Sequence, residues 1–522
     1  MGLKKTIIKN LFTGWLGQFA LIFSAIIVTP ILINHFGKYE YGMWVTIGQG
    51  ALIFSLFDFG VANSVSRIVA KNLALKKYDE ISKIYSTAIA IFIFASLLVL
   101  FLTIIVLPFV PDVFKINDSH RTIAHWLFGL TCLNIFIILP LRVGRGLLQA
   151  KDRYDLIFLY KALITLLRLI FVILIFGRGI GHLILLAIIT LGLNLLLEIL
   201  LFRIAVKKYE VLKFKISLAN KQHFKELISL GASSMVQTFS GTMFDKAQII
   251  FIGLILGVSA TPLFAVPYLI IISVGSFVNR LGGTFTPISS RLHATNNKSQ
   301  LRRLNILGVR YGLALSIPIS VFILLYGKEL INLWLGQDAL ADNDINIIVL
   351  VLNIFLIPFA LGWPQGASRT MLRGTGKHWL AANGQFISSF IGLMVSIFIM
   401  LYTNWGVLGA AIGWSLKTFL LNILIFPIAI CRHLKIPGWD YFKTAYLLPI
   451  LSIFPLLLIG KIMERFIPIT NIYSCGFVTL GFFAMGGLGI FFMIIVPEDR
   501  SYLFQLLPQR LTQAMNIASK SQ

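Results

Sequence analysis

Two apolar stretches decide the fold: SLGASSMVQTFSGTMFDKAQIIFIGLILG (residues 229–257) and LFAVPYLIIISVGSFVNRLGGTFTPISSRL (residues 263–292). Each is long enough to cross a bilayer as a helix, which takes about 20 apolar residues. Each also carries charge in its interior, with Asp245 and Lys246 in the first stretch and Arg280 in the second. A charge in hydrocarbon is costly, so these residues predict a functional site or a buried partner.

The composition indicates an all-α polytopic membrane protein. Of 522 residues, 57% are hydrophobic and 12% are charged, and the mean hydropathy is +0.88. A soluble core could not hide so much apolar surface, whereas a bundle of spanning helices exposes it to lipid. The apolar runs are continuous, which argues against a membrane β-barrel. The net charge of +25 would suggest nucleic acid in a soluble protein, but here basic cytoplasmic loops explain it.

We expect about fourteen transmembrane helices. Their predicted ranges are 11–35, 42–66, 84–110, 123–148, 156–177, 182–206, 227–256, 262–290, 306–326, 345–371, 380–402, 406–431, 444–461 and 472–496.

The basic residues predict that both termini are cytoplasmic. With the N-terminus inside, 34 of the 45 lysines and arginines fall in or beside cytoplasmic segments and seven fall in the opposite loops. Cytoplasmic loops carry such an excess in bacterial membrane proteins. The other four bases, Arg168, Lys246, Arg280 and Lys417, lie inside predicted spans.

An internal repeat divides the chain into two lobes of six helices. Arg67 and Arg145 are 78 residues apart, as are Arg291 and Arg369, and the offset between the pairs is 224. Six is an even number, so the halves are parallel repeats and a site is expected between them. We expect an N-lobe (1–206), a cytoplasmic linker (207–226), a C-lobe (227–433), and two C-terminal helices with a cytoplasmic tail (434–522).

Several stretches resemble the polysaccharide and O-antigen flippases of the multidrug/oligosaccharidyl-lipid/polysaccharide (MOP) exporter superfamily. They are HFGKYEYGMWVTIGQGALIFSLFDFGVANSVSRIVAK (residues 35–71), FDKAQIIFIGLILG (residues 244–257) and PEDRSYLFQLL (residues 497–507). The resemblance implies a V-shaped bundle of two lobes that works by alternating access. It also implies a substrate built on undecaprenyl diphosphate.

Polar residues at helical spacing indicate the wall of a hydrated cavity. Ser234, Gln237, Gly241, Asp245 and Gln248 share one face of the seventh span, and the eighth span repeats the pattern. The members of that second stripe are Ser273, Ser276, Arg280, Thr284, Pro287 and Arg291. Small polar residues can instead mediate helix packing, so this alternative stays open.

We predict that cations in the spans bind the substrate diphosphate. Arg280 offers a planar fork of donors that matches phosphate oxygens, and Lys246, Lys417 and Arg168 would add positive charge. Three acids, Asp58, Asp245 and Glu198, are candidates for ion coupling or for structural pairing, and Arg168 is expected to pair with Glu198. Arg67, Arg145, Arg291 and Arg369 are interpreted as cytoplasmic anchors, with a gate as the alternative.

The predicted function is the transfer of lipid-linked oligosaccharide across a bacterial cytoplasmic membrane. No catalytic residues, metal ligands or cofactor motif are apparent, and the only ion expected is a coupling H⁺ or Na⁺. The expected partners are an undecaprenyl-diphosphate-linked glycan, membrane lipids, a polysaccharide polymerase and a chain-length regulator, with no nucleic acid and a monomeric chain. Alternatives are a lipid II flippase, a cation-coupled drug exporter and, from another class, a polysaccharide polymerase or glycosyltransferase.

Overall fold

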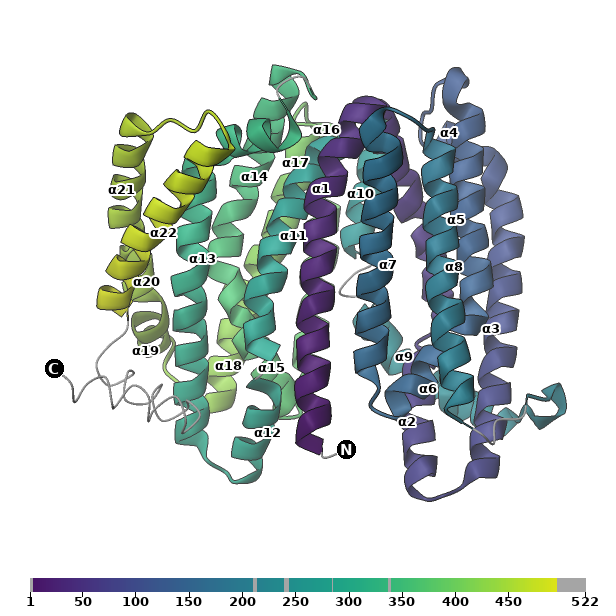
Figure 1. Ribbon diagram of the computed structural model, residues 1–522. Helices are drawn as coiled ribbons and strands as arrows, with labels where there is room; N and C mark the ends of the chain where they lie inside the picture. Colours follow the sequence, from purple (N-terminus) through teal and green to yellow (C-terminus); the bar gives the residue numbers. More distant parts are fainter. Residues whose placement is uncertain (1–2, 210–213, 239–243, 284, 337–338, 495–522) are drawn as a thin grey trace. The chain divides into compact units, whose positions relative to one another are not determined.

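The computed structural model describes residues 3–209, 214–238, 244–283, 285–336 and 339–494, and within these ranges it contains helices and no strand (Figure 1). The side chains of some helical residues, including 232–238 and 277–283, lie outside the description. Continuous apolar runs form helices here because only an element that satisfies its own backbone hydrogen bonds is stable in lipid.

The first part of the chain forms eight helices: α1 (Leu3–Leu52), α2 (Val61–Ala74), α3 (Tyr78–Val106), α4 (Val110–Val113), α5 (Arg121–Leu141), α6 (Val143–Ala150), α7 (Tyr154–Ile175) and α8 (Leu183–Lys207). The middle part forms α9 (Lys221–Thr238), α10 (Phe244–Leu256), α11 (Thr261–Gly283), α12 (Phe285–Ala294), α13 (Lys298–Leu335) and α14 (Asp342–Gly362). The last part forms α15 (Gly366–Gly374), α16 (His378–Tyr402), α17 (Val407–Phe419), α18 (Phe426–Leu434), α19 (Gly438–Phe442), α20 (Leu448–Leu451), α21 (Ile453–Phe466) and α22 (Ile472–Ile494).

Eleven helical stretches among the described residues are long and apolar enough to cross a membrane. The first of them, Phe12–Ala74, covers two predicted spans, and α1 turns between these spans at Gly37, whose φ is 72°. The predicted seventh span includes residues outside the description, and Ile472–Gly487 is a shorter apolar helix. The all-helical membrane fold is therefore confirmed, while the number fourteen stays a prediction.

The chain divides into two compact units. One comprises residues 1–273, 334–351 and 385–417, and the other comprises residues 274–333, 352–384 and 418–522. These boundaries fall within helices, whereas the lobes were predicted to be continuous in sequence. The predicted lobe boundaries stay a prediction.

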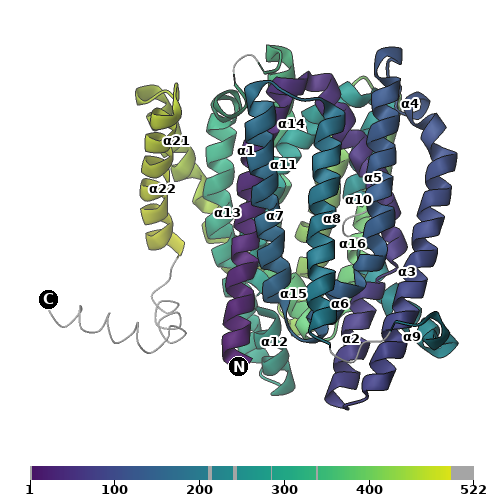
Figure 2. The same ribbon diagram turned by 45° about the vertical axis from the view of Figure 1, so that its right-hand side comes forward.

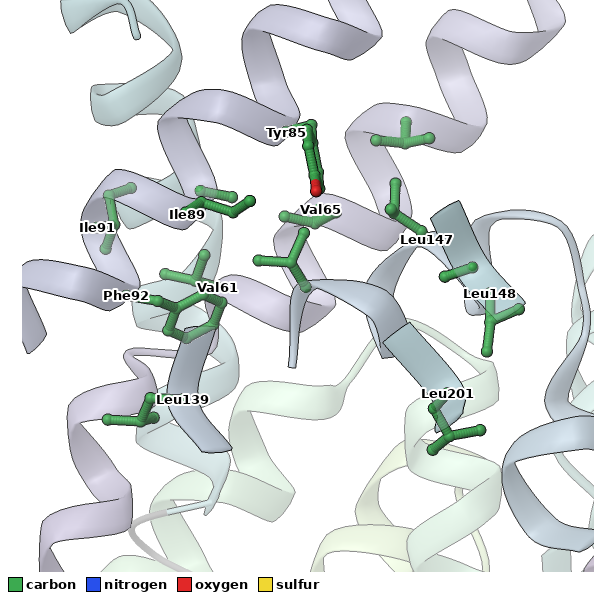
Figure 3. Packing of buried hydrophobic residues seen from close by; sticks show 14 of the residues in the cluster. Val61, Val65, Tyr85, Ile89, Ile91, Phe92, Leu139, Leu147, Leu148 and Leu201 are labelled. Atoms are coloured by element: carbon green, nitrogen blue, oxygen red, sulfur yellow. The ribbon is translucent and has the colours of Figure 1, made fainter. Parts of the chain in front are cut away.

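A buried apolar cluster holds the first unit together. Phe92, Val61 and Leu139 are fully buried in it, together with residues from α3, α6 and α8 (Figure 3). In lipid, helices are held by close packing more than by the hydrophobic effect, so small residues matter. A Cβ added to Gly146 would lie 2.6 Å from the carbonyl oxygen of Ala62, so α6 can approach α2 this closely only with glycine.

Helices α1 and α7 run alongside each other in this unit (Figures 1 and 2). The N-terminal part of α1 and the start of α7 are joined by charge, because Asp155 accepts from both Lys9 and Arg153 at 2.8 Å. Asn10 adds two hydrogen bonds to the same turn, donating to the Asp152 carbonyl and accepting from the Asp155 amide. The start of the chain is thus fixed to the turn before α7.

The repeat appears as a matching interruption in the helices. Helix α6 begins at Val143 and α15 at Gly366, within one residue of the 224-residue offset, and Pro140 and Pro364 lie just before these two helices at that offset. Each half therefore contains a membrane helix that is broken near one end.

Candidate functional site: an intramembrane charge network

The second predicted span breaks at Asp58. After a short 3-10 segment, Ile53–Asp58, the backbone turns at Phe59 (φ 48°) and Gly60 (φ 68°) before α2 begins. Glycine is needed at position 60 because its Cα faces the backbone of Gly231, and a Cβ there would lie 2.5 Å from the Gly231 carbonyl oxygen. The break places the Asp58 carboxylate between helices.

Arg142 supplies the partner of Asp58. It lies between α5 and α6, two residues after Pro140, and its Nη1 donates to Asp58 Oδ2 at 2.9 Å. The two side chains are about a quarter exposed, at 24% and 22%. Asp58 Oδ1 and Arg142 Nε are buried and have no hydrogen-bond partner among the described residues. The pair therefore retains one acceptor and one donor for water or a ligand.

A second ion pair lies beside the first. Arg145 Nε donates to Glu198 Oε2 at 3.0 Å, and its Nη2 donates to Glu198 Oε1, so the contact uses the guanidinium fork. Glu198 is only 3% exposed, so the pair is buried on its acidic side. Asp58 and Arg142 both lie close enough to act electrostatically on the Glu198 carboxylate. The four residues therefore form one network.

The predicted pairing of Arg168 with Glu198 is wrong. Glu198 is occupied by Arg145, which reaches it across the α6–α8 contact. Arg168 instead donates from Nη2 to Asn194 Oδ1 at 2.9 Å. Its charge is thus held by a neutral amide on α8.

A third ion pair ties α10 to α17. Lys417 is 8% exposed, and its ammonium donates to Asp245 Oδ1. The indole Nε1 of Trp414 donates to the same oxygen at 2.9 Å. Gln248, one helical turn further along α10, donates to the Ala410 carbonyl at 3.1 Å and is buried. Gln248 therefore joins two packed helices. At this position the polar stripe mediates helix packing, which the sequence left open as the alternative to a cavity wall.

Lys246 differs from these cations. It is half-buried in α10, and no acid of the described chain forms an ion pair with it. The guanidinium of Arg142 lies close enough to repel its ammonium. Among the described residues, Arg142, Arg145 and Lys246 therefore face two acids, Asp58 and Glu198, which leaves these five groups with one excess positive charge.

The four residues of the two ion pairs belong to the N-terminal half of the repeat, whereas Lys246 belongs to the second half. At the 224-residue offset, Asp58 corresponds to Gly282 and Arg142 to Gly366, so neither member of that pair has a charged counterpart. Arg145 corresponds to Arg369, whose guanidinium lies over the Phe426 ring at 5.5 Å. Glu198 corresponds to Asn422.

The remaining predicted residues are dispersed. Arg67 and Arg291 are exposed on α2 and α12, whereas Arg145 is engaged by Glu198 and Arg369 is half-buried. Ser276 is half-buried in α11. The side chains of Ser234, Gln237, Arg280 and Thr284 lie outside the described residues. The roles assigned to all these residues in substrate binding, coupling or gating stay predictions.

Sequence reasoning missed Arg142 and Trp414. Arg142 was counted as a cytoplasmic base, although an acid in a span, such as Asp58, requires a partner and LPLRVGRG (residues 139–146) offers one near a proline break. Trp414 carried no recognisable signal, because one indole in an apolar run is ordinary. Among the described residues, no three His, Cys, Asp or Glu side chains gather as they would around a metal ion.

The interrupted helices and the charges between them define a polytopic helical membrane protein with a polar interior. The chain belongs to the polysaccharide biosynthesis protein family, whose model matches residues 7–293. It is 21% identical over 425 residues to a putative O-antigen transporter of Shigella flexneri, covering 80% of this chain and 97% of the relative. The polysaccharide family that the sequence resembles is thus confirmed.

Two solved structures share the fold. An inward-facing multidrug-resistance MATE family transporter of the MOP superfamily matches with a TM-score of 0.65 and 14% identity, over 82% of this chain and 96% of the other. The lipid II flippase MurJ in an inward closed conformation also matches with a TM-score of 0.65, at 16% identity, over 92% of this chain and 98% of the other. At such identities the likeness concerns the fold.

Proposed function

We propose that this protein is a flippase that moves an oligosaccharide linked to undecaprenyl diphosphate across the bacterial cytoplasmic membrane by alternating access. The family and the O-antigen transporter relative support transport of a polysaccharide precursor. The proposed passenger has an apolar tail that can stay in lipid and an anionic, sugar-bearing head that needs a polar route. A route of this kind must lower the cost of carrying the diphosphate through hydrocarbon.

The observation that carries the proposal is the excess cation Lys246. A half-buried ammonium that has no ion-pair partner in the described part of the chain is unfavourable in the empty protein and becomes favourable when an anion arrives. Arg142, whose Nε has no hydrogen-bond partner among the described residues, lies near enough to share that anion. Arg280 is proposed as a further ligand. Lys417 and Arg168, being partnered by Asp245 and Asn194, would contribute less.

The test measures the initial flipping rate of a fluorescent lipid-linked oligosaccharide in proteoliposomes. Lys246→Gln should lower the rate about tenfold, the effect of losing one charge-assisted contact, and Lys246→Arg should retain most of it. Arg280→Ala and Arg280→Lys should both impair flipping if a bidentate contact is needed. Arg178→Gln, at an exposed position outside the network, is the matched control.

Two outcomes would overturn the proposal. Full activity of Lys246→Gln would remove the cationic route. Efflux of a cationic drug or flipping of lipid II, without flipping of the oligosaccharide lipid, would assign the fold to another substrate. The proposal includes cytoplasmic termini, a monomeric chain, coupling to H⁺ or Na⁺, and association with a polymerase and a chain-length regulator. Each of these can be tested separately.

A further inference from the structure

An apolar cleft lies in the second unit and shares no residue with the charge network. Its volume is about 520 Å³, within the range of about 300–1,000 Å³ that small-molecule sites occupy. Its walls come from the end of α14, from α18 and the π-helical segment before it, and from α19, α20 and the π-helical segment between them. The lining residues are almost all apolar, and Arg432 is the one charged residue among them.

Both walls contain a π-helical segment, Leu420–Ile425 and Lys443–Leu447. Ile423 and Tyr446, from these segments, line the cleft. The π-helix is rare, and single π-turns often mark functional sites. The irregular backbone is therefore concentrated where the two walls face each other.

The inner wall is fixed by buried hydrogen bonds. Gln365 donates from Nε2 to the hydroxyl groups of Tyr441 and Tyr446, at 3.1 and 2.5 Å. Both tyrosines are almost fully buried, and both line the cleft. Because their hydroxyl groups are bonded to Gln365, they present the apolar parts of their rings to the cleft. The cleft consequently offers an apolar surface to its occupant and keeps its polar atoms behind that surface.

The outer edge carries exposed apolar residues, as expected of a surface that faces lipid. Ile428 is 49% exposed and Phe442 38%, and both line the cleft. Trp439 is 71% exposed and stacks on Phe442, with ring centroids 5.7 Å apart. Exposed tryptophan and tyrosine at a helix end are typical of the level of the lipid headgroups. The cleft therefore extends from that level into the apolar part of the membrane.

Arg432 gives the cleft its charge preference. It is exposed near the end of α18, and no acid of the described chain pairs with it, although Asp440 is close in sequence. Neighbouring arginines are used structurally, since Arg302 Nε donates to the Leu434 carbonyl and Arg310 Nε to the Thr444 carbonyl, both at 2.7 Å. An apolar slot beside an unpaired guanidinium complements an acyl chain that is attached to a phosphate.

We propose that this cleft binds an anionic membrane phospholipid, with an acyl chain between α18 and α19 and its phosphate at Arg432. The site is independent of the transport route proposed above, because none of its lining residues belongs to the charge network. A water-soluble ligand would leave the apolar walls unmatched, whereas a phospholipid satisfies both parts of the cleft.

The test uses the full-length protein in nanodiscs that contain phosphatidylglycerol or phosphatidylcholine with a photoreactive group in the acyl chain. Cross-links are mapped by mass spectrometry to residues 423–450. We expect phosphatidylglycerol to label this segment about fivefold more than phosphatidylcholine, the effect of one basic residue at a membrane surface. Arg432→Gln should abolish this preference, and Ile428→Trp, which fills the slot, should reduce labelling by both lipids.

Arg373→Gln is the control, because Arg373 is an exposed arginine at the end of α15 that does not line the cleft, so the preference should persist. Equal labelling by the two lipids in the unmodified protein would overturn the proposal, as would a preference that survives Arg432→Gln. Displacement of the phosphatidylglycerol label by equimolar undecaprenyl phosphate would also overturn it, since the cleft would then bind the tail of the transported lipid. Flipping activity is not the readout, so this result and the proposed function can fail separately.

Discussion

Arg142 Nη1 donates to Asp58 Oδ2 at 2.9 Å, and this ion pair joins two interrupted membrane helices. Each residue lies at the break itself, Asp58 before α2 and Arg142 before α6. The equivalent positions in the second half of the repeat, Gly282 and Gly366, have no side chains that could form such a bond. The first half therefore joins its two broken helices by an ion pair that the glycines at the equivalent positions of the second half cannot form.

Breaking this connection should destabilise the protein. Because both side chains are about a quarter exposed, we expect Asp58→Asn or Arg142→Gln to cost about 1–2 kcal/mol, between the values for surface and buried pairs. Asp58→Asn should be the worse change, since it leaves Arg142, Arg145 and Lys246 facing Glu198 alone. Thermal unfolding in detergent measures this loss of stability. If the double variant, Asp58→Asn with Arg142→Gln, unfolds at no lower temperature than Asp58→Asn alone, the two residues are coupled. Additive effects would contradict the pairing.

The Arg145–Glu198 pair should matter more for stability because Glu198 is buried. Glu198→Gln removes the charge that Arg145 faces and should cost about 3–5 kcal/mol, lowering the unfolding temperature substantially. Arg145→Lys keeps the charge but loses the two-point contact, so a smaller cost of about 1–2 kcal/mol is expected. Asn194→Ala, which removes only the neutral partner of Arg168, is the comparison. A Glu198→Gln variant as stable as the parent would show that the pair contributes nothing.

Lys417 can be assigned to pairing or to substrate by a mutant cycle with Asp245. If its role is structural, Lys417→Gln and Asp245→Asn should each destabilise, and the double variant should recover part of the loss because no charge is left unpaired. Flipping should then follow stability. If Lys417 binds the diphosphate, Lys417→Gln should lower flipping about tenfold even where Asp245→Asn restores stability.

Gly60 and Gly179 provide a matched pair of backbone variants. Both are in the left-handed αL region, with φ 68° and ψ 14° at Gly60 and φ 72° and ψ 17° at Gly179, so alanine at either position should cost about 1–2 kcal/mol in backbone strain. A Cβ at Gly179 meets no atom within 4 Å, whereas at Gly60 it would meet the Gly231 backbone. Gly60→Ala should therefore lower the unfolding temperature further than Gly179→Ala. Equal effects would mean that α2 and α9 separate without cost.

The sequence predicted the helices well because hydropathy is a local property. Runs of about 20 apolar residues must be helical in lipid whatever they contact, so α3, α7 and α8 could be placed without knowing their neighbours. The repeat was also visible, because Arg67, Arg145, Arg291 and Arg369 keep their spacing. The breaks at Asp58 and Arg142 were not predicted, because apolar residues surround both positions and hydropathy does not register a change of φ.

The charge pairs were harder to predict because they join residues distant in sequence. Lys417 and Asp245 are 172 residues apart, and no local pattern distinguishes this pairing from others. The sequence placed Arg168 and Glu198, which have opposite charges, in neighbouring predicted spans and so suggested that they pair. In the structure, helix α6 brings Arg145 to Glu198 instead. Which cation meets which acid depends on helix rotation, and a shift of one residue turns a side chain by about 100°.

The separation of Lys417 from Asp245 also bears on how the chain is made. Ribosomes add about 5–20 residues per second, so Asp245 leaves the ribosome roughly 10–35 seconds before Lys417 does. Glu198 and Arg145, only 53 residues apart, can join far earlier. During that interval α10 carries an acid without its lysine, which costs about 2.5–3.5 kcal/mol at the centre of a bilayer. The newborn helix must therefore be sheltered by the insertion machinery, or take up a proton, until α17 arrives.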